Sequence, residues 1–305
     1  MRSIRRVVAV AGLAVVLSTS AAAAQDLEPR AYSNVPVGMN FLILAYAYSH
    51  GDVAFDQSVP IEDAELTINA VALGYARSID VWGRAGKLDV VIPQAWLSGS
   101  AKVAGQPQER EVSGLGDPRF RLSVLLYGAP SLTLEQFASY HPDLIVGVSL
   151  AVTAPLGQYD STRLINVGTN RWSIKPELGI SKTLGPFTFE LATSVTFYTT
   201  NHDFLRGGTL EKSPLFAAQL HAIYHTPRGL WAAIDATYYA GGRATINGGE
   251  PGDRLENLRL GATLAIPLTK YHSLKLYGSA GAMARTGGNF NTLGIAWQYR
   301  WGAGL

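Results

Sequence analysis

The sequence predicts an all-β protein, a single antiparallel β-barrel of about twelve strands of the type found in bacterial outer membranes. Three observations support this prediction. The N-terminus has the pattern of a secretory signal, segments of alternating hydrophobicity recur along the rest of the chain, and the connections between them alternate between short turns and long polar loops.

The first 24 residues are predicted to be a signal peptide. Three arginines within the first six residues precede an apolar run at 7–17, and a stretch of small residues ending at Ala24 offers a cleavage site before Gln25. This run is shorter than the roughly 20 residues of a transmembrane helix, so an uncleaved anchor is the weaker alternative. We expect a short periplasmic segment at 25–36 and a barrel at 37–305, in the outer membrane of a Gram-negative cell.

Composition limits the classes of partner. The chain has a formal net charge of +2, and removal of the signal, which holds three Arg and no acidic residue, leaves 22 Lys and Arg against 23 Asp and Glu. This balance gives no reason to expect a nucleic-acid partner. The lack of cysteine excludes disulfides and thiolate chemistry, and we expect no cofactor. Without a linker or an internal repeat, one mature domain is the simplest interpretation.

Twelve segments are expected to form the strands, because each is alternating or rich in small residues and is bounded by turn residues. Their approximate ranges are 37–49, 64–78, 80–97, 115–128, 142–156, 170–184, 187–200, 214–227, 230–242, 256–268, 272–285 and 289–301. The second and third have mixed parity, so the face that each turns to lipid stays open. An even strand number is typical of bacterial barrels, and twelve strands predict a lumen narrower than that of a porin.

The last segment, 289–301, shows the alternation most clearly. Leu293 and Ile295 lie on one parity, whereas Gln298 and Arg300 lie on the other. In a membrane barrel the first set faces lipid and the second faces the lumen. The aromatic residues gather toward the end of the segment, as expected at a membrane interface.

The connections indicate which ends of the strands lie together. Short turns at 78–79, 185–186, 227–229 and 270–271 alternate with long polar connections at 50–63, 98–113, 157–169, 201–213 and 241–255. This is the pattern of the periplasmic and extracellular rims of an outer-membrane barrel. One connection on the short side, 129–141, is longer, and the run from Ser131 to Glu135 could cap a brief helix ending near Tyr140. A soluble β-sandwich explains the alternating residues but not these alternating connections.

The polar parity of the strands supplies candidate lumen-lining residues of both charges. They are Arg119, Arg121, Lys175, Glu177, Glu190, His221, Asp235, Arg259, Lys275 and Arg300. Two interpretations stay open: the groups could pair across the lumen as a structural network, or they could line a charged permeation path.

Between the fifth and sixth segments, the chain carries motifs of a known family. They are the runs 155–160, 164–172 and 175–179, together with Gly-Leu-Gly-Asp-Pro at 114–118. They resemble the signature of the "MetA-pathway of phenol degradation" family of outer-membrane transporters, and the resemblance extends over about 35–301. One departure is Leu156, where the family pattern has Thr. The resemblance implies an outer-membrane barrel associated with uptake of aromatic or other hydrophobic compounds.

The loop at 157–169 is the candidate gate. Its glycines and asparagines permit tight turns. Tyr159, Arg163, Asn166 and Asn170 could bind solute at the mouth of the barrel. They could instead satisfy the backbone of the loop itself, and the usual behaviour of Asn and Asp side chains in turns favours this second interpretation.

We therefore predict a channel or transporter for small hydrophobic or aromatic solutes, with membrane lipid and the solute as partners. The alternatives are a structural or loop-binding barrel with a sealed lumen and, less favoured, a hydrolase. His272 and Ser273 are adjacent and point to opposite faces of a strand. His221 and His225 share a face but lie about 13 Å apart, too far to hold one metal ion. We expect no catalytic or metal-binding residue and no enzyme activity.

Overall fold

The structure is a computed structural model that describes residues 28–54, 61–103, 106–284 and 287–305. The predicted signal peptide at 1–24 and its cleavage site lie outside these residues. Among the described residues, no helix is long and apolar enough to cross a membrane.

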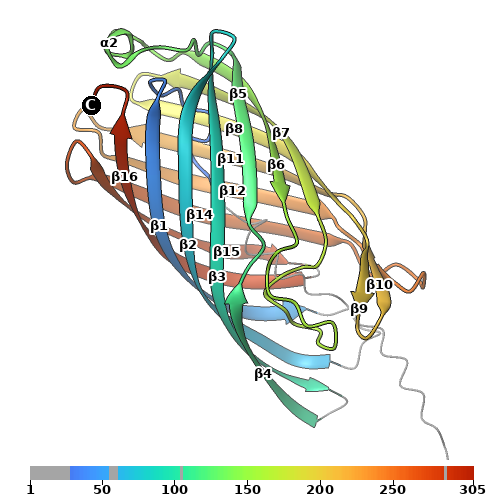
Figure 1. Ribbon diagram of the computed structural model, residues 1–305. Helices are drawn as coiled ribbons and strands as arrows, with labels where there is room; N and C mark the ends of the chain where they lie inside the picture. The colour runs from blue at the N-terminus through green and yellow to red at the C-terminus, as the bar shows by residue number, and fades with distance from the viewer. Residues whose placement is uncertain (1–27, 55–60, 104–105, 285–286) are drawn as a thin grey trace, which may run out of the picture.

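The described chain forms one antiparallel barrel of twelve strand positions (Figure 1). β4 and β5 share the fourth position, because both pair with β3 on either side of a break at 116–118. The strands are β1 (Met39–Ala54), β2 (Ile61–Val81), β3 (Arg84–Val103), β4 (Gln106–Leu115), β5 (Arg119–Tyr127), β6 (Leu144–Thr153), β7 (Ser173–Leu184), β8 (Phe187–Tyr198), β11 (Leu215–His225), β12 (Trp231–Gly241), β14 (Leu255–Pro267), β15 (His272–Ala284) and β16 (Gly287–Gly302).

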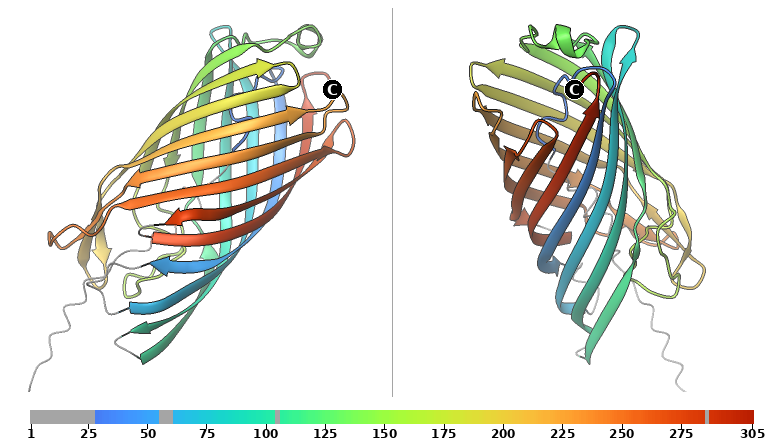
Figure 2. Two further views of the ribbon diagram at one scale, coloured as in Figure 1. Left: turned by 180° about the vertical axis from the view of Figure 1, so that it is seen from behind. Right: turned by 60° about the vertical axis from the view of Figure 1, so that its left-hand side comes forward.

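The barrel closes between its first and last strands. β1 pairs with β16 from Met39 opposite Gly302 to Ala54 opposite Gly287, and β2 pairs with both β1 and β3. Closure removes the free sheet edges that hydrocarbon would not tolerate. Figure 2 shows the oblique strands wrapping around the whole circumference. The twelve predicted strands and their closure are confirmed.

The turn between β2 and β3 differs from the prediction. Ser78 and Ile79 were expected to form it, but they pair with Lys87 and Gly86 inside the ladder. The turn lies at Trp82 and Gly83, which have φ angles of 51° and 79°. Two positive φ values are typical of the tight turn whose twist matches a hairpin. Because these two segments have mixed parity, the sequence pattern did not show how many residues pair before the turn.

The end with long connections contains more strand than expected. Residues 98–113 were predicted to be a loop, but 98–103 continue β3 and 106–113 form most of β4. A small separate sheet is built there from β9 (Asn201–Phe204), β10 (Gly208–Lys212) and β13 (Ala244–Ile246). Polar composition was a poor guide in these segments because strands outside lipid need no apolar face.

The helix predicted within 129–141 is confirmed as a single turn, α2 (Leu134–Phe137), at the end with the short turns. Its N-cap is Thr133, whose hydroxyl accepts from the backbone N–H of Gln136 while the Gln136 side chain accepts from Thr133 N–H. This reciprocal capping box satisfies two amide groups that a helix start leaves unpaired.

The two faces of the wall carry opposite chemistry. Large apolar side chains such as Leu293 (70 % exposed) and Ile234 (73 % exposed) point outward, as lipid-facing residues do. On β2 the inward residues include Leu66 and Ile68, and on β3 they include Leu97, whereas Leu73 is exposed on the outside. These positions settle the orientation of both strands, which the sequence pattern had left open.

Candidate functional site

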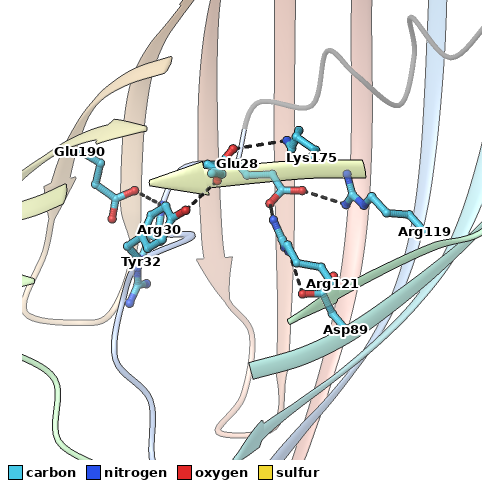
Figure 3. Close-up of polar contacts among 9 residues, drawn as sticks. Glu28, Arg30, Tyr32, Asp89, Arg119, Arg121, Lys175 and Glu190 are labelled. Carbon is cyan, nitrogen blue, oxygen red and sulfur yellow. Dashed lines mark hydrogen bonds and ion pairs between the residues drawn. The ribbon is translucent and has the colours of Figure 1, made fainter. Parts of the chain in front are cut away.

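The chain before β1 runs inside the barrel. Within the segment 25–36, expected to be a short periplasmic stretch, the described residues 28–36 contact the inner wall (Figure 3). Tyr32 is 2 % exposed. Its ring fills a notch made by Gly147 on β6 and Gly179 on β7, which are direct partners in the ladder. A Cβ atom at these two glycines would lie 2.6 Å and 2.0 Å from the Tyr32 ring, so neither position accepts a larger residue without displacing it.

Polar contacts fix both ends of this N-terminal segment. Glu28 accepts from Arg119 at 2.9 Å and also pairs with Arg121. The Tyr32 hydroxyl donates to Glu177 at 2.9 Å, and the backbone N–H of Arg30 donates to Glu190 at 2.8 Å. Because these partners come from β5, β7 and β8, the segment runs across several neighbouring strands of the inner wall instead of following one strand (Figure 3).

The remaining predicted lumen residues also lie in polar contacts. Arg121 donates to Asp89 at 2.9 Å, and Lys175 lies 3.3 Å from Glu177. His221 and Asp235 are joined at 2.6 Å across neighbouring strands, with Thr263 donating to the same carboxylate. Three further cations complete the predicted set: Arg259 donates to Ser279, Lys275 stacks over the ring of Tyr277, and Arg300 donates to the carbonyl of Lys270 at the short-turn rim.

A cavity of about 10 Å³ lies beside Tyr32 in the lumen, and its lining includes Glu28, Lys175 and His221. A space of this size holds no more than about one water molecule. The N-terminal segment thus occupies part of the lumen at the level of Tyr32.

The loop 157–169 lies at the opposite end of the barrel, where its two ends are held together by Asp117. One oxygen of this carboxylate accepts from Gly157 N–H at 2.8 Å, and the other accepts from Thr169 N–H at 2.8 Å and from the Thr169 hydroxyl at 2.6 Å. Asp117 belongs to the Gly-Asp-Pro break between β4 and β5. The break thus places an acceptor between the two stems of the loop.

The four candidate gate residues make contacts mostly within the loop region. Asn166 accepts from Asp160 N–H and donates to the carbonyls of Asp160 and Arg163. Arg163 is exposed and lies 4.0 Å from Asp160. Hydrogen bonds from the Thr162 hydroxyl and N–H lower the pKa of Asp160, an exposed carboxyl.

The other two gate candidates connect the loop to β9. Asn170, with a φ of 52°, donates to the side chain of Asn201 at 2.9 Å. The Tyr159 hydroxyl accepts from Asn201 and donates to the carbonyl of Asp203, and burial raises its pKa. These contacts order the loop, and a role for the four residues in gating stays a prediction.

Beneath the loop, the inner wall is apolar. Val167 packs in a cluster with Leu66, Ile68, Leu97 and Phe290, all at most 8 % exposed. Partly buried apolar residues around it include Ile165, also from the loop. The mouth therefore has an apolar inner patch, which we call the mouth patch, formed by residues 66, 68, 97, 167 and 290.

Sequence reasoning missed the roles of Asp117, Glu28 and Tyr32. The Gly-Asp-Pro motif was noted, but spacing gave no sign that its carboxylate reaches a loop about 40 positions later. Among the residues preceding β1, the adjacent charges and the tyrosine were a usable signal, because a lumen lined by both charges needs partners. Within the described ranges, no group of three or more His, Cys, Asp or Glu side chains could hold a metal ion.

Residues 49–297 match the family described as "Putative MetA-pathway of phenol degradation". The chain belongs to this family. None of the curated proteins matches the chain.

Solved structures show the same architecture. The COG4313 outer membrane channel from Pseudomonas putida F1 is similar with a TM-score of 0.75 and 22 % identity, over 90 % of this chain and all of that one. The transport unit of the autotransporter AIDA-I from Escherichia coli has a TM-score of 0.52 and 10 % identity, over 90 % of this chain and 93 % of that one. The beta domain of the Bordetella autotransporter BrkA has a TM-score of 0.50 and 14 % identity, over 87 % and 99 %. The fold is that of outer-membrane barrels.

Proposed function

We propose that this family member is a non-enzymatic outer-membrane channel that admits small hydrophobic or aromatic solutes, with the loop 157–169 controlling access. The family description refers to phenol degradation, and the structural neighbour from Pseudomonas putida is an outer membrane channel. The N-terminal pattern supports export to the outer membrane, with cleavage near Ala24.

The mouth patch is the observation that carries the proposal. An apolar solute that reaches Leu66, Leu97 and Phe290 leaves water and gains roughly 25 cal/mol for each Å² of apolar surface buried. A sugar gains nothing comparable there. Below the patch the lumen is lined by charged groups and is occupied by residues 28–36, a surface on which an apolar body gains nothing comparable.

The wall beside β4 offers such a solute a way out of the mouth. In the described chain β4 pairs with β3 alone, and its outer edge is met by the loop, where Gln158 N–H donates to the carbonyl of Leu115 at 2.7 Å. Movement of one loop would therefore uncover both the mouth patch and this edge. At Leu115, the exposed apolar end of β4 next to β5, an apolar solute could then pass into lipid without crossing the lumen.

The test is a deletion of residues 161–167 in cells that express the barrel, with uptake of a phenolic compound and of a hydrophilic sugar followed in parallel. We expect phenolic uptake to rise because Ile165 and Val167 no longer cover the wall residues of the mouth patch, Leu66, Ile68, Leu97 and Phe290. The matched control is deletion of residues 248–251, an exposed turn before β14. Unchanged uptake of both solutes by a correctly inserted deletion variant would refute the gating role.

A further inference from the structure

Two cations lie about 5 Å from the centre of one aromatic ring at the end of the barrel that carries the long loops. The Arg171 guanidinium lies 5.0 Å from the centroid of the Tyr198 ring, and the Lys212 ammonium lies 4.9 Å from it. Arg171 directly follows the loop region, and Lys212 ends β10. Two like charges that share one ring repel each other, so a negative group between them would be stabilising.

Arg171 is buried without adequate partners. The residue is 3 % exposed, and its Nε and Nη1 atoms have no hydrogen-bond partner in the described part of the chain. Nor does any carboxylate described there form an ion pair with it. The carboxylate of Asp117 attracts the positive charge of Arg171. Both of its oxygens, however, already accept hydrogen bonds from Gly157 and Thr169. A buried guanidinium with unused donors is costly unless a ligand supplies the acceptor.

The surroundings of this pair are apolar. Leu215, Ala217 and Tyr239 form a buried cluster, with Tyr198 and Leu255 packed against it. Tyr198 therefore belongs both to the cation pair and to an apolar surface. This combination does not match inorganic phosphate, which has no apolar body, and it does not match a neutral hydrocarbon, which has no use for two cations.

We infer that Arg171 and Lys212 bind the carboxylate of a small amphipathic acid whose aromatic or aliphatic body packs on Tyr198, Tyr239 and Leu215. The inference rests on the proposed channel function and narrows its solute class to organic anions with an apolar body. The carboxylate would accept from the unused donors of Arg171, and the apolar cluster would exclude water from the rest of the molecule.

The charge state of Lys212 supports the same site. Burial, together with the positive charge of Arg171, lowers the pKa of Lys212 to about 7. A bound carboxylate favours the protonated amine, so the affinity should be greatest below pH 7 and should fall between pH 6 and 8. Over this range Arg171 stays charged and a simple carboxylate stays ionised, while a tyrosine such as Tyr198 ordinarily titrates near pH 10.

Binding to the full-length protein in detergent, measured by titration calorimetry, tests the inference with benzoate, benzyl alcohol and phosphate. We expect benzoate to bind more tightly than either of the others, and Arg171→Gln to weaken benzoate roughly tenfold or more while leaving benzyl alcohol unchanged. Lys212→Gln should remove the pH dependence. Arg206→Gln, at an exposed position beside β10, is the matched control. Folding of each variant is checked by circular dichroism.

Equal binding of benzoate and benzyl alcohol, equal binding of benzoate and phosphate, or an unchanged affinity in folded Arg171→Gln would overturn the anion site. Uptake of neutral phenol by cells that express the same variants separates the two proposals. If benzoate binding is absent while phenol uptake persists, the anion site is wrong and the channel stands. If benzoate binds as expected while no solute is taken up, the anion site stands and the channel function fails.

Discussion

At the scale of single residues, one aromatic side chain holds the N-terminal segment in the lumen. Tyr32 occupies space that exists because its wall partners are both glycine, and its hydroxyl adds a bond to Glu177. Ion pairs of Glu28 hold the same segment farther along. Hydrophobic packing and charge therefore act on different residues of one short segment.

Tyr32→Ala should release this segment. Removal of a buried aromatic ring lowers the free energy of unfolding by about 3 to 5 kcal/mol. A typical hydrogen bond contributes only about 0.5 to 1.5 kcal/mol, so the remaining polar contacts of the segment would not make up the loss. Single-channel conductance in planar bilayers should rise, because residues 28–36 would no longer occupy the lumen near β6 and β7. Ser33→Ala, on the same segment, is the control. Equal conductance of wild type and Tyr32→Ala would show that the segment does not limit ion flow.

Ile295→Arg tests the lipid face of the last strand. Ile295 is 41 % exposed on the outer surface, so the substitution should cost about 2 to 4 kcal/mol if the position lies near the middle of the bilayer. Gln298→Arg, on the opposite parity, should be much milder. The measurement is the free energy of folding into lipid vesicles, and similar losses for the two variants would mean that the assigned faces are wrong.

At the scale of elements, the break between β4 and β5 organises the mouth. In a continuous strand at 116–118, the backbone of Asp117 would be held in the ladder, and its carboxylate would not lie between the two stems of the loop. Asp117 accepts three hydrogen bonds from Gly157 and Thr169, so the loop is closed by one residue of the wall.

Asp117→Asn should loosen the loop without unfolding the barrel. The amide can accept through one atom where the carboxylate accepted through two, and a lost charge-assisted bond is worth about 1.5 to 3 kcal/mol. Hydrogen exchange at the amides of Gly157 and Thr169 should therefore quicken roughly tenfold or more. Asp253→Asn, at an exposed position in another connection, is the control. Protection as strong as in the wild type would contradict the role given to Asp117.

The sequence was a good guide to elements in lipid and a poor one outside it. Alternation located all twelve strands because each must turn one face to hydrocarbon and the other inward. It failed for β4 and for the small sheet of β9, β10 and β13, because these segments are mostly polar and their few buried apolar residues, such as Phe204 and Leu210, form no alternating stripe. Parity also predicted candidate lumen residues, but pairings such as Arg121 with Asp89 depend on register, which parity does not specify.

At the scale of the whole molecule, three chemically distinct surfaces are arranged along one barrel. The outside is apolar, the lumen is charged and occupied by residues 28–36, and the mouth carries an apolar patch under a single loop. Position along the barrel thus separates the apolar mouth patch from the charged lumen. No stretch of sequence shows this separation, because each surface combines residues from distant strands.

The most direct test of the central claim compares uptake of two solutes by otherwise identical Gram-negative cells with and without the protein. We predict that expression increases uptake of a labelled phenolic compound and leaves uptake of a similarly sized hydrophilic sugar unchanged, because the mouth patch binds only the first and the lumen passes neither freely. An equal increase for both solutes, or no increase for the phenolic compound despite correct insertion, would contradict the account.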